Sequence, residues 1–324
     1  MSALEGLGHA REIDPEGRVR AIELRDAATP SAGWRWLHLG RKSLEARDWL
    51  RARSGLGEET VAALLEQDTR PRLSLTEAGA LLVLRGVNRN AGAHPEDMIS
   101  LRLHIDRARI VSVEGRRLRV VEDRLRALDA GETPTLGAAL LGLVRALRED
   151  AEPVLDGLQA AVDAFELEAV RSEVAMPVRR RRALNDARHD AIQIHRHIHP
   201  QAGAVTALAR AKPDWLGKRE RDALRREGEA FGRISEDLEA VRSRAAVISD
   251  EQALRVAEET NRLMATLSII SVIFLPLTFL TGLLGVNLAG IPFAEAAWSF
   301  DAFALSLGGL AALGALILRR IGLI

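Results

Sequence analysis

The chain has 324 residues, of which 47% are hydrophobic and 28% charged, and its 45 basic residues balance its 45 acidic ones. A neutral chain lacks the excess positive charge that nucleic-acid binding requires, so we expect no nucleic acid among its partners. The composition is too apolar for a disordered chain. The absence of cysteine excludes disulfides, thiolate metal sites and a cysteine nucleophile.

Short strand and helix patterns alternate in the first part of the chain. Helical patterns begin near Ser43 and Gly57. The strand-like segments are residues 34–39, 80–84, 99–105 and 110–113. We therefore predict a cytoplasmic α/β domain with a mixed sheet over residues 1–120.

From about Leu118 the pattern becomes helical, and residues 121–262 are predicted to form a cytoplasmic helical region. Prolines mark the expected breaks between its helices, because proline removes a backbone donor. These are Pro134, Pro177, Pro200 and Pro213.

The longest predicted helix begins near Gly217 and meets no strong breaker before Pro276. Its apolar positions follow the alternating spacing of 3 and 4 that is typical of a coiled-coil seam: Phe231, Ile234, Leu238, Val241, Ala245 and Ile248. About 60 residues of helix would span about 90 Å. Such a stalk needs lateral partners, so we expect the chain to oligomerise.

Two uncharged stretches near the C-terminus are long enough to cross a lipid bilayer as helices. They predict spans at about residues 265–285 and 299–318, within a membrane domain over residues 263–324. A buried hairpin in a large soluble core is the alternative.

Arginines predict the orientation of these spans. Arg262 precedes the first span and Arg319 follows the second, whereas the connecting loop carries only Glu295 and Asp301. By the positive-inside rule, both termini of this multi-pass chain are cytoplasmic and the loop faces outside.

Polar and small residues gather on one face of the first span. Spacing of 3 and 4 selects seven positions, which we call the polar stripe: Asn261, Met264, Leu267, Ser271, Leu275, Thr278 and Gly282. The opposite face holds larger apolar residues, among them Ile269, Ile273 and Leu277. Such a stripe faces either an aqueous path between several chains or a partner helix, and the periodicity leaves both open.

The run FLPLTFLTGLLGVN, which ends in Gly285, Val286 and Asn287, resembles the first transmembrane helix of the CorA superfamily of divalent-cation transporters. In that family the signature is usually Gly-Met-Asn. The form found here, followed by Gly-Ile-Pro at 290–292, is similar to the ZntB branch. Residues 67–88 and 95–106 are also similar to cytoplasmic stretches of that branch.

This resemblance implies an inner-membrane homopentamer with a cytoplasmic funnel, pore-lining first helices and an outer ring of second helices. It implies transport of Zn²⁺ together with H⁺, in the direction of uptake. The alternatives are a Mg²⁺, Co²⁺ or Ni²⁺ channel, with Cd²⁺ as a further candidate ion, or a membrane-anchored cytoplasmic metal sensor or scaffold. We expect no prosthetic group and no enzymatic activity.

The signature residues suit a hydrated cation. A ring of Asn287 amides can bond the water shell of an ion without holding it too tightly. Gly285 permits a sharp turn, and Val286 supplies bulk. Glu295 and Asp301 would attract cations to the mouth, unless they are ordinary solvated loop charges.

Histidines are densest just before Pro200. His195 and His199 lie one helical turn apart, which makes them a candidate zinc pair. No carboxylate stands in register inside this cluster, so solvated or structural roles are the alternative.

Overall fold

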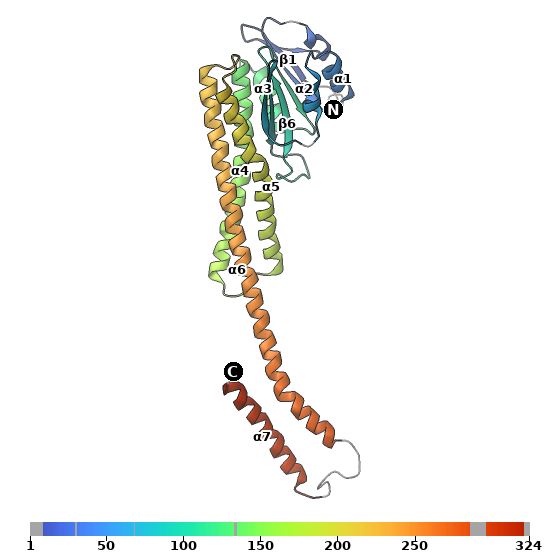
Figure 1. Cartoon of the computed structure of the whole chain (residues 1–324), viewed down its shortest axis with the longest axis vertical. Helices are drawn as coiled ribbons and strands as arrows, with labels where there is room; N and C mark the ends of the chain where they lie inside the picture. Colours follow the sequence, from blue (N-terminus) through green and yellow to red (C-terminus); the bar gives the residue numbers. More distant parts are fainter. Residues whose placement is uncertain (1–8, 30, 68, 133–134, 286–295, 321–324) are drawn as a thin grey trace. The chain divides into compact units, whose positions relative to one another are not determined.

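The computed structural model describes residues 9–29, 31–67, 69–132, 135–285 and 296–320. Contacts divide the chain into two units. Unit 1 comprises Met1–Arg171 and Pro177–Ser249, and unit 2 comprises Ser172–Met176 and Asp250–Ile324. The elements, labelled in Figure 1 where there is room, are β1 (His9–Ile13), β2 (Val19–Ile22), the 3-10 helix η1 (Leu24–Ala28), β3 (Trp34–Gly40), α1 (Leu44–Ala52), α2 (Glu58–Leu65), β4 (Arg72–Thr76), β5 (Gly79–Gly86), β6 (Ile99–Ile105), β7 (Arg109–Glu114), α3 (Arg119–Asp129), α4 (Leu136–Arg171), α5 (Val178–Ala211), α6 (Lys218–Leu284) and α7 (Ser299–Arg320).

Unit 1 contains a seven-stranded sheet in the order β2-β1-β3-β7-β6-β5-β4. The pair β3–β7 is parallel and the other pairs are antiparallel, so the predicted mixed sheet is confirmed. The four predicted strands correspond to β3, β5, β6 and β7. The strands that the sequence pattern missed, β1, β2 and β4, are short and carry arginines.

Alternation of side chains buries both faces of this sheet. On one face Leu37 and Val111 belong to an apolar cluster that includes Trp49 of α1 and Leu64 of α2. On the other face the backbone approaches α4 closely, since a Cβ at Gly86 would stand 2.8 Å from the Leu147 side chain. The sheet is therefore a central layer between the short helices α1 and α2 and the long helices.

The long helices of unit 1 pack through the predicted apolar seam of α6. All six seam residues, from Phe231 to Ile248, are buried, which confirms the prediction. Glu227, one helical turn before Phe231, is also buried. Arg145 and Arg148 of α4 donate to its carboxylate at 2.9 and 2.7 Å. The stalk helix is thus held within its own chain by apolar contacts and a buried ion pair.

The predicted proline breaks have different outcomes. Pro177 and Pro213 lie between helices, as predicted, and Pro134 lies outside the described residues. The break predicted at Pro200 is wrong, because α5 continues through it. Ile198 and Gln201 on either side are fully buried, and Gln201 Oε1 accepts a 2.6 Å hydrogen bond from the Arg85 N–H of β5. Packing on both sides outweighs the one backbone bond that proline removes.

Unit 2 consists of the C-terminal part of α6, helix α7 and the turn between α4 and α5. Gln252 accepts from the backbone N–H of Met176 at 2.7 Å, and Glu259 accepts from that of Ala175 at 2.9 Å. Helix α6 passes Pro276 and ends at Leu284 after 67 residues, slightly beyond its predicted extent.

Candidate functional site

Helices α6 and α7 each contain a stretch that is long and apolar enough to cross a membrane. The two predicted spans, about 265–285 and 299–318, fall within these helices except for Gly285. Within the described chain 0% of the α6 stretch and 6% of the α7 stretch are buried, which distinguishes both from the core helix of a soluble protein. The alternative of a buried soluble hairpin is therefore disfavoured, because exposed apolar helices of this length require lipid or partner chains.

The face of α6 opposite the polar stripe packs towards α7. Ile273 Cγ1 lies 3.7 Å from the point where a Cβ at Gly314 of α7 would stand. Ile269, Leu277 and Leu280 share this face at 3 and 4 residue spacing, and all are half-buried. The structure thus assigns one face of the span to a helix of the same chain.

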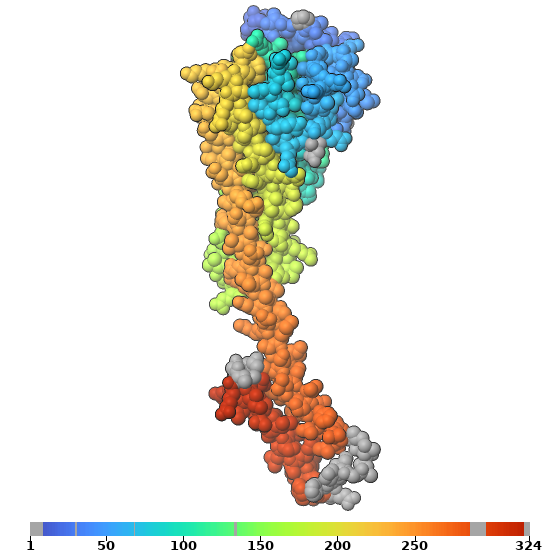
Figure 2. Space-filling model, viewed as in Figure 1, coloured from blue at the N-terminus to red at the C-terminus, as the bar shows by residue number. Residues whose placement is uncertain are grey.

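The polar stripe lies on the other side of α6. Leu275 is two residues, or about 200°, from Ile273 and is 74% exposed. All seven stripe residues are exposed, and they belong to the segment of α6 that Figure 2 draws in orange. No described residue of the chain covers this stripe, so its neighbours must come from elsewhere.

Hydroxyl groups on the stripe present oxygen lone pairs. Ser271 Oγ donates a hydrogen bond to the Leu267 carbonyl oxygen at 2.8 Å. This bond satisfies the hydroxyl donor, for which lipid offers no acceptor. Thr281 Oγ1, beside the stripe, donates likewise to the Thr278 carbonyl at 3.0 Å. With the protons turned back to the helix, the oxygens remain free to accept from water around a cation.

The signature begins at the very end of α6. The Gly285 N–H donates to the Thr281 carbonyl at 2.9 Å. Val286, Asn287 and Glu295 lie outside the described residues. Asp301 is exposed in the first turn of α7, where the helix dipole favours a carboxylate. The selectivity and mouth roles given to these residues therefore stay predictions.

His195 and His199 come together as their spacing predicts. Their rings stack on α5 with centroids 5.4 Å apart. Among the described residues, no group of three or more His, Asp or Glu side chains is placed to hold a metal ion. A metal at this pair would therefore take part of its ligands from water.

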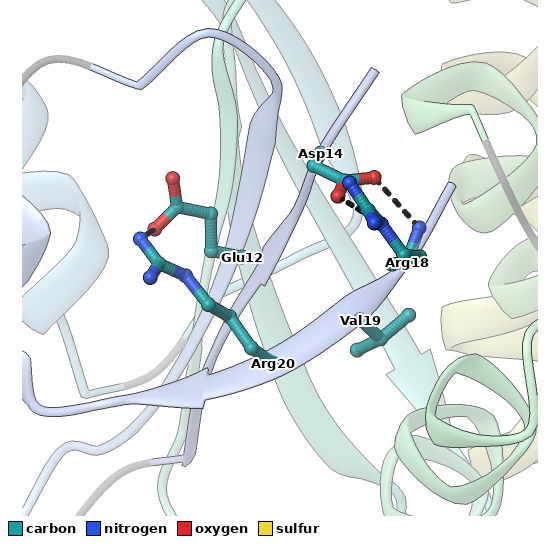
Figure 3. A pocket seen from close by; sticks show the side chains of 5 residues that line it. All are labelled: Glu12, Asp14, Arg18, Val19 and Arg20. Atoms are coloured by element: carbon teal, nitrogen blue, oxygen red, sulfur yellow. Dashed lines mark hydrogen bonds and ion pairs between the residues drawn. The ribbon is translucent and has the colours of Figure 1, made fainter. Parts of the chain in front are cut away.

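A cavity of about 310 Å³ beside the β1–β2 hairpin was not anticipated from the sequence. Figure 3 shows that Glu12, Asp14, Arg18, Val19 and Arg20 line it. Its carboxylates are engaged, since Asp14 accepts from the Arg18 side chain at 2.7 Å and Glu12 from Arg20 at 2.8 Å.

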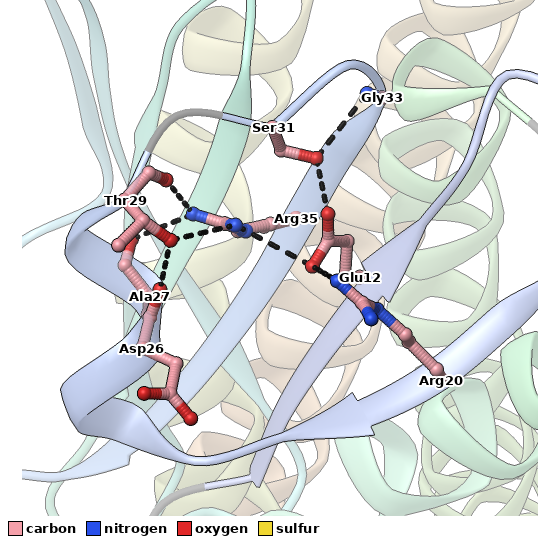
Figure 4. Close-up of polar contacts among 8 residues, drawn as sticks. All are labelled: Glu12, Arg20, Asp26, Ala27, Thr29, Ser31, Gly33 and Arg35. Carbon is pink, nitrogen blue, oxygen red and sulfur yellow. Dashed lines mark hydrogen bonds and ion pairs between the residues drawn. The ribbon is translucent and has the colours of Figure 1, made fainter.

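Glu12 belongs to a network that closes the hairpin onto β3 (Figure 4). Its carboxylate accepts from Ser31 Oγ at 2.5 Å and from the buried Arg35 at 3.4 Å. The Ser31 bond lowers the pKa of Glu12, against the opposing effect of burial. Because the charges are already paired, this cavity is a structural feature of the sheet edge.

Comparison with known proteins bears on the whole chain. The family model described as CorA-like Mg²⁺ transporter protein matches residues 31–321. The divalent cation transporter CmaX of Pseudomonas aeruginosa is 38% identical, over 88% of this chain and 86% of its own. The zinc transport protein ZntB of Pectobacterium atrosepticum is 32% identical, over 94% of each chain.

A solved structure extends the likeness to three dimensions. The structure of the full-length CmaX protein superimposes with a TM-score of 0.82 at 34% identity, covering 98% of this chain and 99% of the other. The resemblance found in the sequence is therefore confirmed, and this chain belongs to the family of CorA-like Mg²⁺ transporter proteins.

Proposed function

We propose that this chain carries Zn²⁺ across the inner membrane, along the axis of a homopentamer, with uptake coupled to protons. Its membership of a divalent-cation transporter family supports the transport function. The observation that carries the pathway is the polar stripe of α6, which faces away from α7 and lacks a covering element among the described residues. One helix cannot enclose a path, so several copies of α6 must surround it.

The chemistry of the span favours a cation that stays hydrated. From Leu263 to Gly285 the sequence contains no histidine and no carboxylate. The polar side chains of the stripe are the Asn261 amide and the hydroxyls of Ser271 and Thr278, and the Asn287 amide follows the stripe in the sequence. Leu267 and Leu275 between them would form apolar constrictions that close by dewetting.

Zinc is the favoured cargo for two reasons. Relatives that cover 94% of the chain are named zinc transport proteins. In addition, Val286 replaces the methionine that the magnesium-channel form of the signature usually carries. The arginine pattern around the spans supports cytoplasmic termini.

Ion flux into proteoliposomes tests this proposal. Zn²⁺ and Mg²⁺ are supplied separately, with and without an inward proton gradient, and Co²⁺, Ni²⁺ and Cd²⁺ serve as further ions. Zinc uptake stimulated by the gradient is the expected result. Gradient-independent flux that prefers Mg²⁺ would assign the chain to the channel type, and no flux by folded oligomers would favour an anchored sensor or scaffold.

The variant Asn287→Ala tests the signature. We expect transport to be lost while size-exclusion chromatography shows unchanged oligomers, because the amide ring and not the fold is removed. Normal flux through this variant would contradict the role of Asn287.

A further inference from the structure

A two-histidine cluster lies on the cytoplasmic part of the chain, remote in sequence from the membrane spans. His195 and His199 project from one face of α5, with ring centroids 5.4 Å apart and ring planes 27° apart. Two imidazoles at this spacing on a helix can direct one nitrogen each towards a shared ion. This pair belongs to unit 1 and has no part in the proposed conduction path.

A contact with α6 orients the ring of His199. His199 Nδ1 lies 3.2 Å from Ser235 Oγ of α6. With Nδ1 engaged by the hydroxyl, Nε2 is the nitrogen left for a ligand. A hydrogen bond at the second ring nitrogen is the usual way in which a metal-binding histidine is oriented.

A carboxylate stands near the pair on the neighbouring helix. Glu239 follows Ser235 by one turn of α6 and acts electrostatically on His195. It is hydrogen-bonded to Arg242 in this structure, so it offsets the charge of a bound cation without serving as a ligand.

From these observations we propose that His195 and His199 form a binding site for a transition-metal cation, with Zn²⁺ as the representative ion. Imidazole nitrogens suit Zn²⁺, Ni²⁺ and Cu²⁺, whereas Mg²⁺ requires oxygen ligands. Two protein ligands leave the remaining positions to water, since the described residues supply no third ligand in place. The bound ion is therefore exchangeable with the solvent that bathes unit 1.

The test is calorimetric titration of the purified full-length oligomer with Zn²⁺ in the presence of excess Mg²⁺, which occupies hard-cation sites. The parent is compared with His195→Ala/His199→Ala. The matched control is His189→Ala/His197→Ala, which removes two histidines from the same helix. We expect the first pair of substitutions to abolish one zinc site per chain, and the control to retain it.

A second readout guards against loss of folding. If the alanine variant fails to assemble, His199→Gln replaces it, because glutamine keeps a hydrogen-bonding group near Ser235 while removing the imidazole. We then expect zinc affinity at this site to fall at least tenfold, and Cu²⁺ bound to the parent to show nitrogen coupling in its paramagnetic resonance spectrum that the variant lacks.

The outcomes are separable from those of transport. The site is independent of the proposed pore, so Asn287→Ala must leave the titration unchanged even where flux is lost. Equal zinc stoichiometry in the parent and in the His195/His199 variants, or an equal loss in the control, would overturn the proposal.

Discussion

Two stretches of α6 share one spacing but differ in what covers them. In unit 1, the seam from Phe231 to Ile248 repeats every 3 and 4 residues and is buried by other helices of the same chain. In unit 2, the polar stripe from Asn261 to Gly282 has the same spacing of 3 and 4 but lies in another register, and it is exposed. Periodicity alone thus identifies a contact face without revealing whether the partner is the same chain.

The composition of the two stretches indicates the missing partner. The seam consists of apolar residues, all of them large except Ala245, and their burial away from water stabilises the fold. The stripe mixes hydroxyls, glycine and an amide with leucines, a pattern that gains little from contact with lipid. The first stretch therefore stabilises the fold of one chain, whereas the second has the composition that the proposed function assigns to a contact between several chains.

Truncating the seam should have the largest effect on stability. Phe231 is 0% exposed, so Phe231→Ala replaces a buried aromatic ring with a cavity. We expect this to lower the free energy of unfolding by about 3–5 kcal/mol. The measurement is denaturant unfolding of the full chain, followed by circular dichroism. Val247→Ala is the control on the same helix, because Val247 is 68% exposed. Equal losses in both variants would contradict the comparison.

The buried ion pair beside the seam should rank next. Glu227→Ala leaves Arg145 and Arg148 without their shared carboxylate, and we expect a loss of about 3 kcal/mol. Glu229→Ala is the matched control, since Glu229 is an exposed partner of Arg225 at 4.0 Å. Its effect on the unfolding free energy should be close to zero.

Lowering the pH should reveal a smaller contribution to the free energy of unfolding, from the ionised carboxylate of Asp106 next to the sheet. Asp106 has its pKa lowered from 3.8 to about 2, because hydrogen bonds from His104, the Ala108 N–H and Arg109 outweigh the raising effect of burial. A carboxyl with a depressed folded pKa stabilises the fold above the unfolded pKa and loses this effect as the pH falls through the folded pKa.

The expected result concerns the difference in unfolding free energy between the parent and Asp106→Asn. It should be about 2 kcal/mol at pH 7 and should shrink as the pH falls from about 4 to about 2. Asp123→Asn, which changes an exposed partner of Arg126, should give a flat difference. A pH-independent gap for Asp106→Asn would refute this assignment.

The reactivity of introduced cysteines tests which face of the α6 span meets water, and it does not depend on a difference in stability. The chain contains no cysteine, so each introduced thiol is unique. Ser271→Cys and Thr278→Cys should react with a water-soluble thiol reagent in the membrane, whereas Ile270→Cys and Leu277→Cys should not. The reverse pattern would contradict the proposed assignment of faces, because it would place the polar stripe against lipid or α7.

Patterns with strong periodicity could be predicted from the sequence, and features that depend on packing could not. The seam of α6 and the strand at residues 99–105 were predicted because their apolar residues repeat at the helical and strand periods. The helix through Pro200 was not, because its stability comes from the burial of Ile198 and Gln201.

The candidate site divides in the same way. The position of the polar stripe was predicted from spacing. The approach of Ile273 to Gly314 shows that the opposite face of α6 packs towards α7, so the stripe faces away from α7. The Glu12 network escaped prediction because its members, Ser31, Arg20 and Arg35, are separated in sequence and meet only through the register of β1, β2 and β3. The roles of Asn287 and Glu295 remain predictions.

Proline within the membrane part of α6 has a consequence for the backbone. Pro276 lies inside the helix and has no N–H, so the carbonyl oxygen of Val272, four residues earlier, loses its helical donor. Hydrocarbon offers no substitute, and a bare carbonyl is tolerated at that depth only beside water or another polar group. Val272 lies one residue, or about 100°, from Ser271 of the polar stripe and equally far from Ile273 on the face that packs towards α7. The proline therefore leaves an uncharged acceptor whose partner must be water or another polar group, and only a substitution of Pro276 itself would return a helical donor to it.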